Sequence, residues 1–330
     1  METRTLGRTD IVVSTLGFGG APLGAVGARI DDDTVAAIVQ TARDGGIRYF
    51  DTAPLYGHGL SEKRLGRSLV DLPREDFVLS TKVGRLLVPT GQGERNTGMR
   101  DSEPVDFRYD YTYDAARASL TESLERLGLD RVDILLCHDI DLWTHGDDQP
   151  GVYETAARGA LPALADLRAE GTIRAFGLGV NNWEVCARVL ADFDPDCFLL
   201  AGRFTLLEQA PLDTFLPECL ARQVSVIVGG PYNSGLLAVD ERRRATYDYK
   251  PVDDARWERA QQIREVCAAH GVDMRAAALQ YPLRHPAVAS VIPGVWSVEE
   301  VRTNLALMAA ELPEALWDDL ADAGLARRIS

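Results

Sequence analysis

Short apolar runs alternate along the chain with segments in which apolar residues recur every three or four positions. The first pattern is typical of buried strands and the second of amphipathic helices. Runs that predict strands are STLGFGG (14–20), IRYFD (47–51), FVLSTKV (77–83), RVDILLCHD (131–139), TIRAFGLGV (172–180), CFLLAG (197–202), VSVIVGG (224–230) and VASVIPG (288–294). Each is followed by a helical pattern, over 31–44, 61–70, 114–127, around 161–167, 182–193, 212–223, 253–269 and 297–308.

Eight strand–helix units in succession predict a parallel sheet closed into a (β/α)8 barrel. No stretch with the composition of a linker divides the chain, so we expect one barrel domain over residues 1–330. A turn at 7–10 between two strand patterns predicts an N-terminal β-hairpin over residues 1–14. An open doubly wound sheet is the alternative, and it is disfavoured because no G-x-G-x-x-G fingerprint follows the first strand.

One connection is much longer than the others. About thirty residues, 84–113, separate the strand pattern at 77–83 from the next helix. A loop of this length in a compact domain is usually a lid or a binding loop. It follows the carboxyl end of a strand, so we expect a long loop on the catalytic face of the barrel. The loop over 229–250 is a second candidate for determining specificity.

Polar side chains follow three successive predicted strands. Asp51 ends the second strand, with Tyr56 in the loop behind it, Lys82 ends the third and His138 ends the fourth. Each has an ordinary structural explanation by itself, as a turn former, a solvated charge or a packed ring. Their conjunction at neighbouring strand ends favours an active site, because that is where barrel enzymes carry their catalytic groups.

These four side chains have a common chemistry. A free Tyr, with a pKa of about 10, is a poor base at neutral pH. A nearby Lys ammonium favours the phenolate, and Asp51 would keep Lys82 charged and oriented. His138 could donate a hydrogen bond to a substrate oxygen. The group could exchange a proton with that oxygen while a hydride moves elsewhere.

Composition excludes several classes of partner. With 35 basic and 50 acidic residues among 330, the net charge of −15 disfavours binding to nucleic acid or to anionic membranes. The longest apolar runs are strand-sized, far below the about 20 residues of a membrane helix, and no signal peptide is evident. Five cysteines without a C-x-x-C pair indicate free thiols in a reducing cytoplasm. We expect a monomer or small homo-oligomer that binds small molecules and no metal ion.

Several motifs resemble the aldo-keto reductases in order along the whole chain. They are GFGG (17–20), DTAPLYGHGLSEKRLGRSL (51–69), STKVGR (80–85), LERLGLDRVDILLCHD (124–139) and IPGVWSVEEVRTN (292–304). The resemblance implies the (β/α)8 barrel, a nicotinamide cofactor bound without a Rossmann domain, and a catalytic tetrad at Asp51, Tyr56, Lys82 and His138.

The resemblance also implies a set of cofactor contacts. Asn181-Asn182 stands where the family commonly has Ser-Asn on the nicotinamide carboxamide. Ala201 replaces the usual Gln, and the Tyr that stacks on the nicotinamide falls near Gly229, so this pocket must be closed in another way. The remaining implied cofactor positions are Asp51, Gly235, Leu236, Ile292, Pro293, Gly294, Glu300 and, on adenine, Asn304.

The stretch that would meet the cofactor ribose predicts a preference for NAD. NADPH-preferring relatives often carry IPKS followed by an Arg, whereas here Gly294 and Val295 replace Lys and Ser and Glu300 aligns with the Arg. A carboxylate repels a 2′-phosphate and can accept hydrogen bonds from a free ribose hydroxyl. Arg302 could still serve a phosphate, so NADP stays open.

Further segments, among them YDYKP (247–251) and HDID (138–141), resemble bacterial aldose 1-dehydrogenases of the L-fucose and D-threo-aldose type. The resemblance implies oxidation of the anomeric C1 hydroxyl of a cyclic hemiacetal sugar to a lactone. The alternatives are a pyridoxal 4-dehydrogenase, an NADPH-dependent carbonyl reductase and a non-catalytic barrel that senses cofactor. Besides Tyr56 and His138, we expect substrate contacts from residues at the barrel mouth, namely Leu55, Arg85 and Trp143, with Asn233 and His58 as weaker candidates.

Overall fold

A parallel sheet forms the centre of the molecule. The computed structural model describes residues 1–25, 29–95 and 102–329. Within those residues one sheet has eight strands, in the order β14-β11-β10-β9-β8-β5-β4-β3. They are β3 (Phe18–Gly19), β4 (Tyr49–Asp51), β5 (Val78–Val83), β8 (Ile134–His138), β9 (Ala175–Val180), β10 (Cys197–Ala201), β11 (Ser225–Gly229) and β14 (Val288–Ile292).

The two edge strands of this sheet meet and close the barrel. Parallel bridges join Leu16 to Val291 and Gly19 to Gly294. The backbone N–H of Gly17 donates to the carbonyl of Val291 over 2.8 Å, and Val291 N–H donates to Thr15 over 2.9 Å. Closure removes the exposed sheet edges, and it confirms the predicted (β/α)8 barrel.

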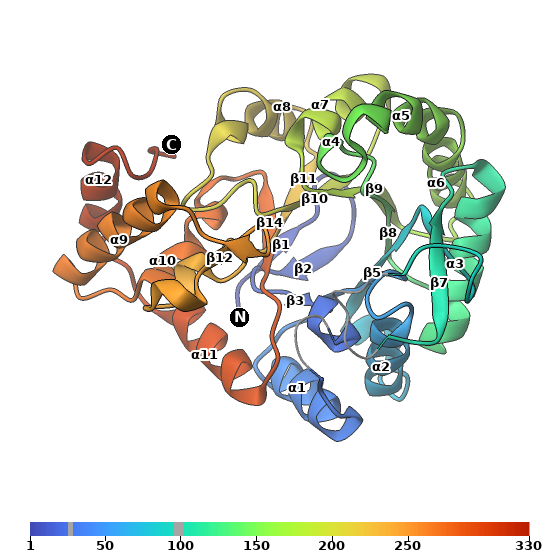
Figure 1. Cartoon of the computed structure of the whole chain (residues 1–330), viewed down its shortest axis with the longest axis horizontal. Helices are drawn as coiled ribbons and strands as arrows, with labels where there is room; N and C mark the ends of the chain where they lie inside the picture. Colours follow the sequence, from blue (N-terminus) through green and yellow to red (C-terminus); the bar gives the residue numbers. More distant parts are fainter. Residues whose placement is uncertain (26–28, 96–101, 330) are drawn as a thin grey trace.

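A ring of helices surrounds the strands (Figure 1). The helices that follow the eight strands are α1 (Asp32–Asp44), α2 (Leu60–Leu69), α3 (Tyr113–Leu127), α6 (Ala160–Ala169), α7 (Trp183–Asp192), α8 (Phe215–Ala221), α10 (Met274–Gln280) and α11 (Val298–Ala309). In α1 the Asp31 side chain caps the N–H of Thr34 over 2.8 Å. Its buried residues, Val35, Ile38, Val39 and Ala42, recur at helical spacing and face the sheet.

Four further helices lie in the connections or after the barrel. They are α4 (Leu142–His145), α5 (Gln149–Arg158), α9 (Asp254–Ala269) and α12 (Glu314–Asp322). The helix predicted over 253–269 is α9, but the sequence pattern missed α10 behind it. Because α10 packs against α11 while α9 contacts α10 and α12, α9 lies farther from the barrel (Figure 1).

The N-terminal hairpin closes one end of the barrel. Strands β1 (Thr3–Thr5) and β2 (Val12–Ser14) pair antiparallel, as predicted. Leu6, Ile11 and Val13 are fully buried. They share one apolar cluster with residues that begin barrel strands, such as Ile134 and Cys197. The hairpin therefore covers the amino-terminal ends of the strands and leaves the carboxyl-terminal end for a site.

The long connection over 84–113 is not an irregular loop, and this corrects the expectation from its length. Strands β6 (Arg85–Pro89) and β7 (Val105–Tyr109) pair antiparallel, with Arg85 opposite Tyr109. A shorter pair, β12 (Thr246–Tyr247) and β13 (Lys250–Pro251), stands in the 229–250 loop. No helix in the described part of the chain is long and apolar enough to cross a membrane.

Candidate active site

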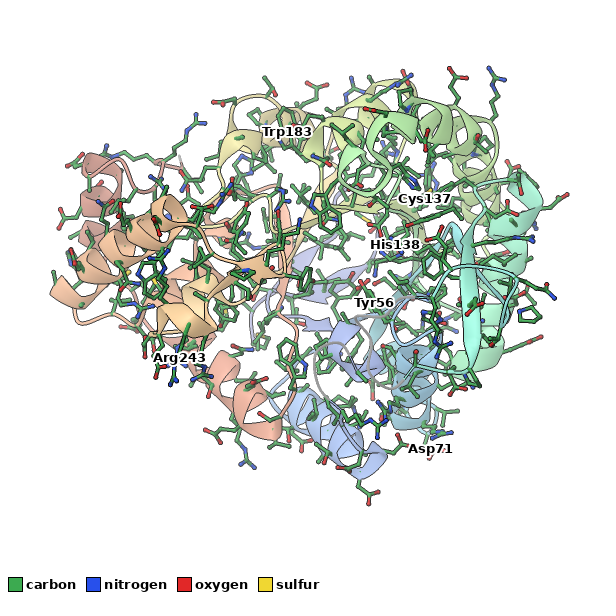
Figure 2. All side chains as sticks on the ribbon, in the orientation of Figure 1. Tyr56, Asp71, Cys137, His138, Trp183 and Arg243 are labelled. Atoms are coloured by element: carbon green, nitrogen blue, oxygen red, sulfur yellow. The ribbon has the colours of Figure 1, made fainter. Side chains whose placement is uncertain are left out.

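Four of the predicted site residues come together at the carboxyl end of three neighbouring strands. Asp51 is the last residue of β4, Lys82 lies in β5 and His138 ends β8. The register places Asp51 opposite Ser80 and Lys82 opposite Leu136, so these ends adjoin. Tyr56 lies in the loop between β4 and α2, and Figure 2 shows it beside His138 within the ring of helices.

Lys82 is the centre of this group. Its ammonium donates to Asp51 Oδ2 over 2.7 Å, to the Thr52 carbonyl over 2.8 Å and to the Tyr56 hydroxyl over 3.2 Å. Ser80 donates to the second Asp51 oxygen over 2.7 Å. Lys82 is 1% exposed and Asp51 2% exposed. A buried ion pair with this many hydrogen bonds is held in one geometry.

Two glycines make room for this arrangement. A Cβ at Gly179 would lie 3.1 Å from Lys82 Cε, and one at Gly24 would lie 2.3 Å from the backbone carbonyl carbon of Tyr56. A turn in which Tyr56 N–H donates to Ala53 and His58 N–H donates to Leu55 then fixes the phenol next to Lys82. The Tyr56 loop is therefore rigidly seated against the first strand–helix connection.

Burial and the neighbouring charges set the protonation of this group. Burial raises the pKa of Tyr56 to about 12, although the Lys82 charge acts in the opposite direction. Burial also raises the pKa of Asp51 against the effect of Lys82. For Lys82, burial lowers the pKa, but Asp51 and Tyr56 outweigh it and the net shift is upward. The resting group is a charged Lys–Asp pair beside a neutral phenol.

His138 presents a neutral imidazole to the phenol. Burial first, and then the charges of Lys82 and Arg85, hold the pKa of His138 well below its usual value. The rings of Tyr56 and His138 are 6.1 Å apart and perpendicular, at 89°. His138 Nδ1 is buried and has no hydrogen-bond partner among the described residues. A neutral imidazole carries one N–H, which could donate a hydrogen bond to a substrate oxygen next to Tyr56.

The structure adds residues that the sequence analysis missed. Asp139, directly after His138, forms an ion pair with Arg85 over 2.5 Å, and its Oδ2 lies 3.4 Å from His138 Nε2. Tyr111 donates to the carbonyl of His138 over 2.9 Å. Position after a strand end could have identified Asp139, since the same rule identified His138. Tyr111 lies before a helix and carried no such signal.

The residues expected around a nicotinamide lie at the ends of β9, β10 and β11. The N–H groups of Asn181 and Asn182 donate to Asp141 Oδ2 over 2.5 and 3.2 Å, and both side chains are half-buried. Asn182 Oδ1 accepts a hydrogen bond from the backbone N–H of Trp143 over 2.8 Å. The Asp141 carboxylate therefore fixes the backbone that carries both amides.

Small residues end the two strands beside these amides. Ala201 and Gly229 are partners in the register of β10 and β11, so two small residues lie side by side. A Cβ on Gly230, which has φ +58°, would meet only backbone atoms of Gly202, at 3.7 Å and beyond. The residues that would hold a nicotinamide ring here are therefore small, with the Asn181 and Asn182 amides at the end of the neighbouring strand β9.

The remaining cofactor candidates lie on the β11 and β14 side. Gly235, with φ +99°, begins a 3-10 turn in which Leu236 is fully buried. Ile292 ends β14, and Pro293 accepts the N–H of Gly19 over 3.1 Å. A Cβ on Gly294 would lie 2.9 Å from Pro22, so this glycine permits a close contact between the first and last strand connections.

Residues expected near the adenosine also have structural partners. Glu300 accepts the N–H of Trp296 over 2.6 Å, and Ser297 caps the N–H of Glu300 over 3.2 Å, so both stabilise the start of α11. Asn304 Oδ1 accepts a hydrogen bond from Tyr232 over 2.7 Å. Arg302 lines a groove of about 510 Å³ between α10 and α11 on the outer ring.

The residues expected to contact the substrate differ in how far they are exposed and in what they bind. Arg85 is buried at the mouth, and Trp143 on α4 is 48% exposed. Leu55 is buried in the Tyr56 turn. Asn233 braces the β10 loop through Gly202 and Thr205, and His58 is buried with Nδ1 2.5 Å from the Val105 carbonyl. The His58 side chain therefore connects the Tyr56 loop to β7.

Enzymes with this fold carry their active sites at the carboxyl-terminal mouth of the barrel, which is where Lys82, Asp51 and Tyr56 are in contact. Residues 15–324 match the model of the Aldo/keto reductase family. The chain belongs to this family, whose enzymes are oxidoreductases that use nicotinamide cofactors.

Individual relatives support this assignment over nearly the full length. The chain is 40% identical to a D-threo-aldose 1-dehydrogenase from Pseudomonas sp, covering 96% of this chain and 95% of the relative. It is 38% identical to a pyridoxal 4-dehydrogenase from Microbacterium luteolum, covering 98% of both. Among solved structures, the holo form of an aldo-keto reductase from Bacillus halodurans aligns with a TM-score of 0.75 at 27% identity, covering 99% and 97%.

Proposed function

We propose that the protein oxidises the anomeric C1 hydroxyl of a cyclic hemiacetal sugar, of the L-fucose or D-threo-aldose type, to a lactone, with NAD as the hydride acceptor. The observation that carries the proposal is the Tyr56 hydroxyl, held 3.2 Å from a buried Lys82 ammonium and beside a neutral His138. The similarity to a D-threo-aldose 1-dehydrogenase supports a sugar as the substrate.

Each side chain has a defined part in this oxidation. The ionised Tyr56 oxygen accepts the proton of the anomeric hydroxyl, and the Lys82 charge stabilises that ionised oxygen. Asp51 balances the charge of Lys82 and fixes its direction. His138 donates a hydrogen bond to the oxygen that becomes the lactone carbonyl. Residues 181, 182 and 229 would hold a nicotinamide ring, which would supply the acceptor for the C1 hydride.

The preference for NAD rests on the start of α11. Its first turn carries Glu299 and Glu300, which would repel a 2′-phosphate, and Gly294 stands where related chains carry a Lys. Because Glu300 already accepts one backbone hydrogen bond, its carboxylate is fixed at this position. The second oxygen of this carboxylate can still accept a hydrogen bond from a ribose hydroxyl.

Pyridoxal is the second candidate substrate, and the relative from Microbacterium luteolum favours it. Like the sugars, pyridoxal closes to a cyclic hemiacetal, so the same groups could remove the same hydrogens.

We place the enzyme in the cytoplasm, which is consistent with five buried cysteines that form no disulfide.

A substrate panel tests the proposed function. Purified protein is mixed with NAD or NADP at mildly alkaline pH and L-fucose, D-arabinose, L-galactose, L-xylose, D-glucose or pyridoxal, while NADH absorbance is followed. We expect turnover of at least one L-fucose-like sugar, faster with NAD, and a lactone product identified by mass and NMR. The matching methyl glycoside, which has no anomeric hydroxyl, should not react.

Other results would assign a different function. Turnover of pyridoxal alone would identify the second candidate. Reduction of aldehydes with NADPH and no oxidation of hemiacetals would indicate a carbonyl reductase. Tight cofactor binding without turnover of any compound would indicate a non-catalytic, cofactor-sensing barrel.

A further inference from the structure

A second ion pair lies at the mouth of the barrel beside the Tyr56 group. Arg85, the first residue of β6, donates to Asp139, which follows β8, over 2.5 Å. Each is 7% exposed. The Arg85 guanidinium also lies over the rings of Tyr109 and Phe107, 4.9 and 5.2 Å from their centroids. The β6–β7 hairpin thus holds a cation in a fixed direction at the site.

The backbone directs Asp139 into this position. Asp139 has φ +52°, a conformation that a residue other than glycine adopts at some cost, and its N–H donates to the Gly179 carbonyl over 2.9 Å. Strain of this kind is kept where the surroundings impose it, and functional sites are the common location. Asp139 is therefore placed in the mouth by the strand end itself.

The pair is close to the reacting groups but does not satisfy all of its polar atoms. Asp139 Oδ2 lies 3.4 Å from His138 Nε2. Arg85 Nε and His138 Nδ1 are both buried with no hydrogen-bond partner among the described residues. A buried polar atom without a partner is costly, and a hydroxyl of a bound ligand, which both donates and accepts, could partner the Arg85 N–H and the imidazole nitrogen.

We propose that Asp139 and Arg85 bind ring hydroxyls of the sugar next to the carbon that is oxidised, the carboxylate as acceptor and the guanidinium as donor. A hydroxyl can both donate and accept, so neighbouring hydroxyls match such a pair. The pair as a whole is neutral, so it offers no net positive charge to an acidic or phosphorylated sugar. The inference rests on the proposed function and specifies its substrate class as neutral polyhydroxylated rings.

The competing explanation is that Asp139 only orients His138. A positioning role would change turnover and its pH profile equally for every substrate, while hydroxyl binding changes affinity for particular hydroxyls. Deoxy sugars separate the two, because each removes one hydroxyl from the ligand while Asp139→Asn removes the charge from the protein.

The test measures binding without turnover. Sugar affinity is measured by calorimetry on NAD-saturated Tyr56→Phe protein, with and without Asp139→Asn, for L-fucose and its single deoxy analogues. We expect Asp139→Asn to lower the affinity for L-fucose about 10–100-fold, which is the range expected for losing a hydrogen bond to a charged group. One deoxy analogue should bind the parent protein more weakly than L-fucose by a similar factor. Its affinity should fall no further when Asp139→Asn is added.

Asp133 provides a matched control at the other end of the same strand. It immediately precedes β8, is 1% exposed and binds Arg74 and Arg174 over 2.6 and 3.1 Å. Asp133→Asn removes an equally buried, arginine-paired charge far from the mouth. We expect it to lower the thermal midpoint while leaving sugar affinity within about twofold.

The outcomes separate this inference from the proposed function. Hydroxyl binding would be overturned if Asp139→Asn lowered the affinity equally for L-fucose and every deoxy analogue. It would also be overturned if Asp139→Asn did not lower the affinity at all. Binding that depends on Asp139, in a protein whose wild type oxidises no sugar, would support the inference and refute the proposed oxidation. If no sugar binds at all, both are wrong.

Discussion

Lys82 is a buried cation whose charge acts on two neighbours at once, the Asp51 carboxylate and the Tyr56 phenol. Because the pKa of Tyr56 is about 12 in this structure, the phenol is mostly protonated at neutral pH. Oxidation needs the phenolate, whose fraction grows tenfold with each pH unit below the pKa. We therefore expect kcat/KM for oxidation to rise between about pH 7 and about pH 10, while kcat/KM for reduction, which needs the protonated phenol, stays nearly constant over that range.

Replacing Lys82 tests this coupling. The Lys82 charge lowers the pKa of Tyr56, so Lys82→Met raises it and reduces the phenolate fraction at every pH. We expect kcat/KM for oxidation to fall at least about 100-fold, with the rise moved to higher pH. Lys63→Met is the control, since Lys63 is half-exposed on α2 and pairs with Glu103 over 3.0 Å. An unchanged pH profile in Lys82→Met would contradict this role.

At the scale of elements, α2 and α3 approach each other closely at Gly66. A Cβ on Gly66 of α2 would lie 1.9 Å from the backbone carbonyl oxygen of Leu127, which ends α3. Gly66→Ala must push the two helices apart, and we expect it to lower the free energy of unfolding by about 2–3 kcal/mol. Urea denaturation followed by circular dichroism measures this change.

Gly151 is the matched control for that experiment. It lies in α5, its φ is not positive, and a Cβ there would meet nothing within 4 Å. Gly151→Ala should stabilise the protein by roughly 0.5–1 kcal/mol, because Ala favours the helix more than Gly does. Equal effects of the two substitutions would show that the close approach of α2 and α3 is not required.

The β12–β13 turn holds an aromatic residue in a strained conformation. Asp248 and Tyr249 have φ +49° and +62°, and Arg203 anchors Asp248 over 2.9 Å. Tyr249 is 76% exposed, yet surrounding protein and then the Asp139 charge raise its pKa. The turn belongs to the connection that follows β11, on the carboxyl-terminal face of the barrel where a substrate would bind.

We predict opposite effects of Tyr249→Gly on stability and on catalysis. Relief of the left-handed strain should stabilise the protein by about 1 kcal/mol, while loss of the ring should raise KM for the sugar. Gln223→Gly, at φ +56° near the N-terminal hairpin, relieves similar strain away from the mouth. The hypothesis fails if Tyr249→Gly, like the Gln223 control, changes only the thermal midpoint.

At the scale of the whole molecule, the sequence predicts the barrel but not everything placed on its mouth. Each strand run is followed by a helix with an apolar stripe, and this local pattern is sufficient for the topology. The β6–β7 pairing was missed because β6 and β7 are short and lie fifteen residues apart. Pairing at that separation depends on contacts such as His58 with Val105, which no local pattern reveals.

The candidate site was predictable to a similar extent. Asp51, Lys82 and His138 were found because they stand at strand ends, a position that sequence alone reveals. The role proposed for Asp139 depends on its left-handed backbone conformation and on its ion pair with Arg85, which belongs to β6. The place of Asp139 after the strand end was visible in the sequence, but its pairing with Arg85 is a consequence of tertiary structure.

The central claim is that Tyr56 takes the proton while a hemiacetal is oxidised. Turnover of the best sugar in the panel with NAD, compared between wild type and Tyr56→Phe, tests it most directly. Cofactor affinity, from quenching of tryptophan fluorescence, shows whether the variant still binds NAD. We predict that Tyr56→Phe lowers kcat at least about 100-fold with cofactor affinity unchanged. Undiminished turnover by Tyr56→Phe would contradict the account.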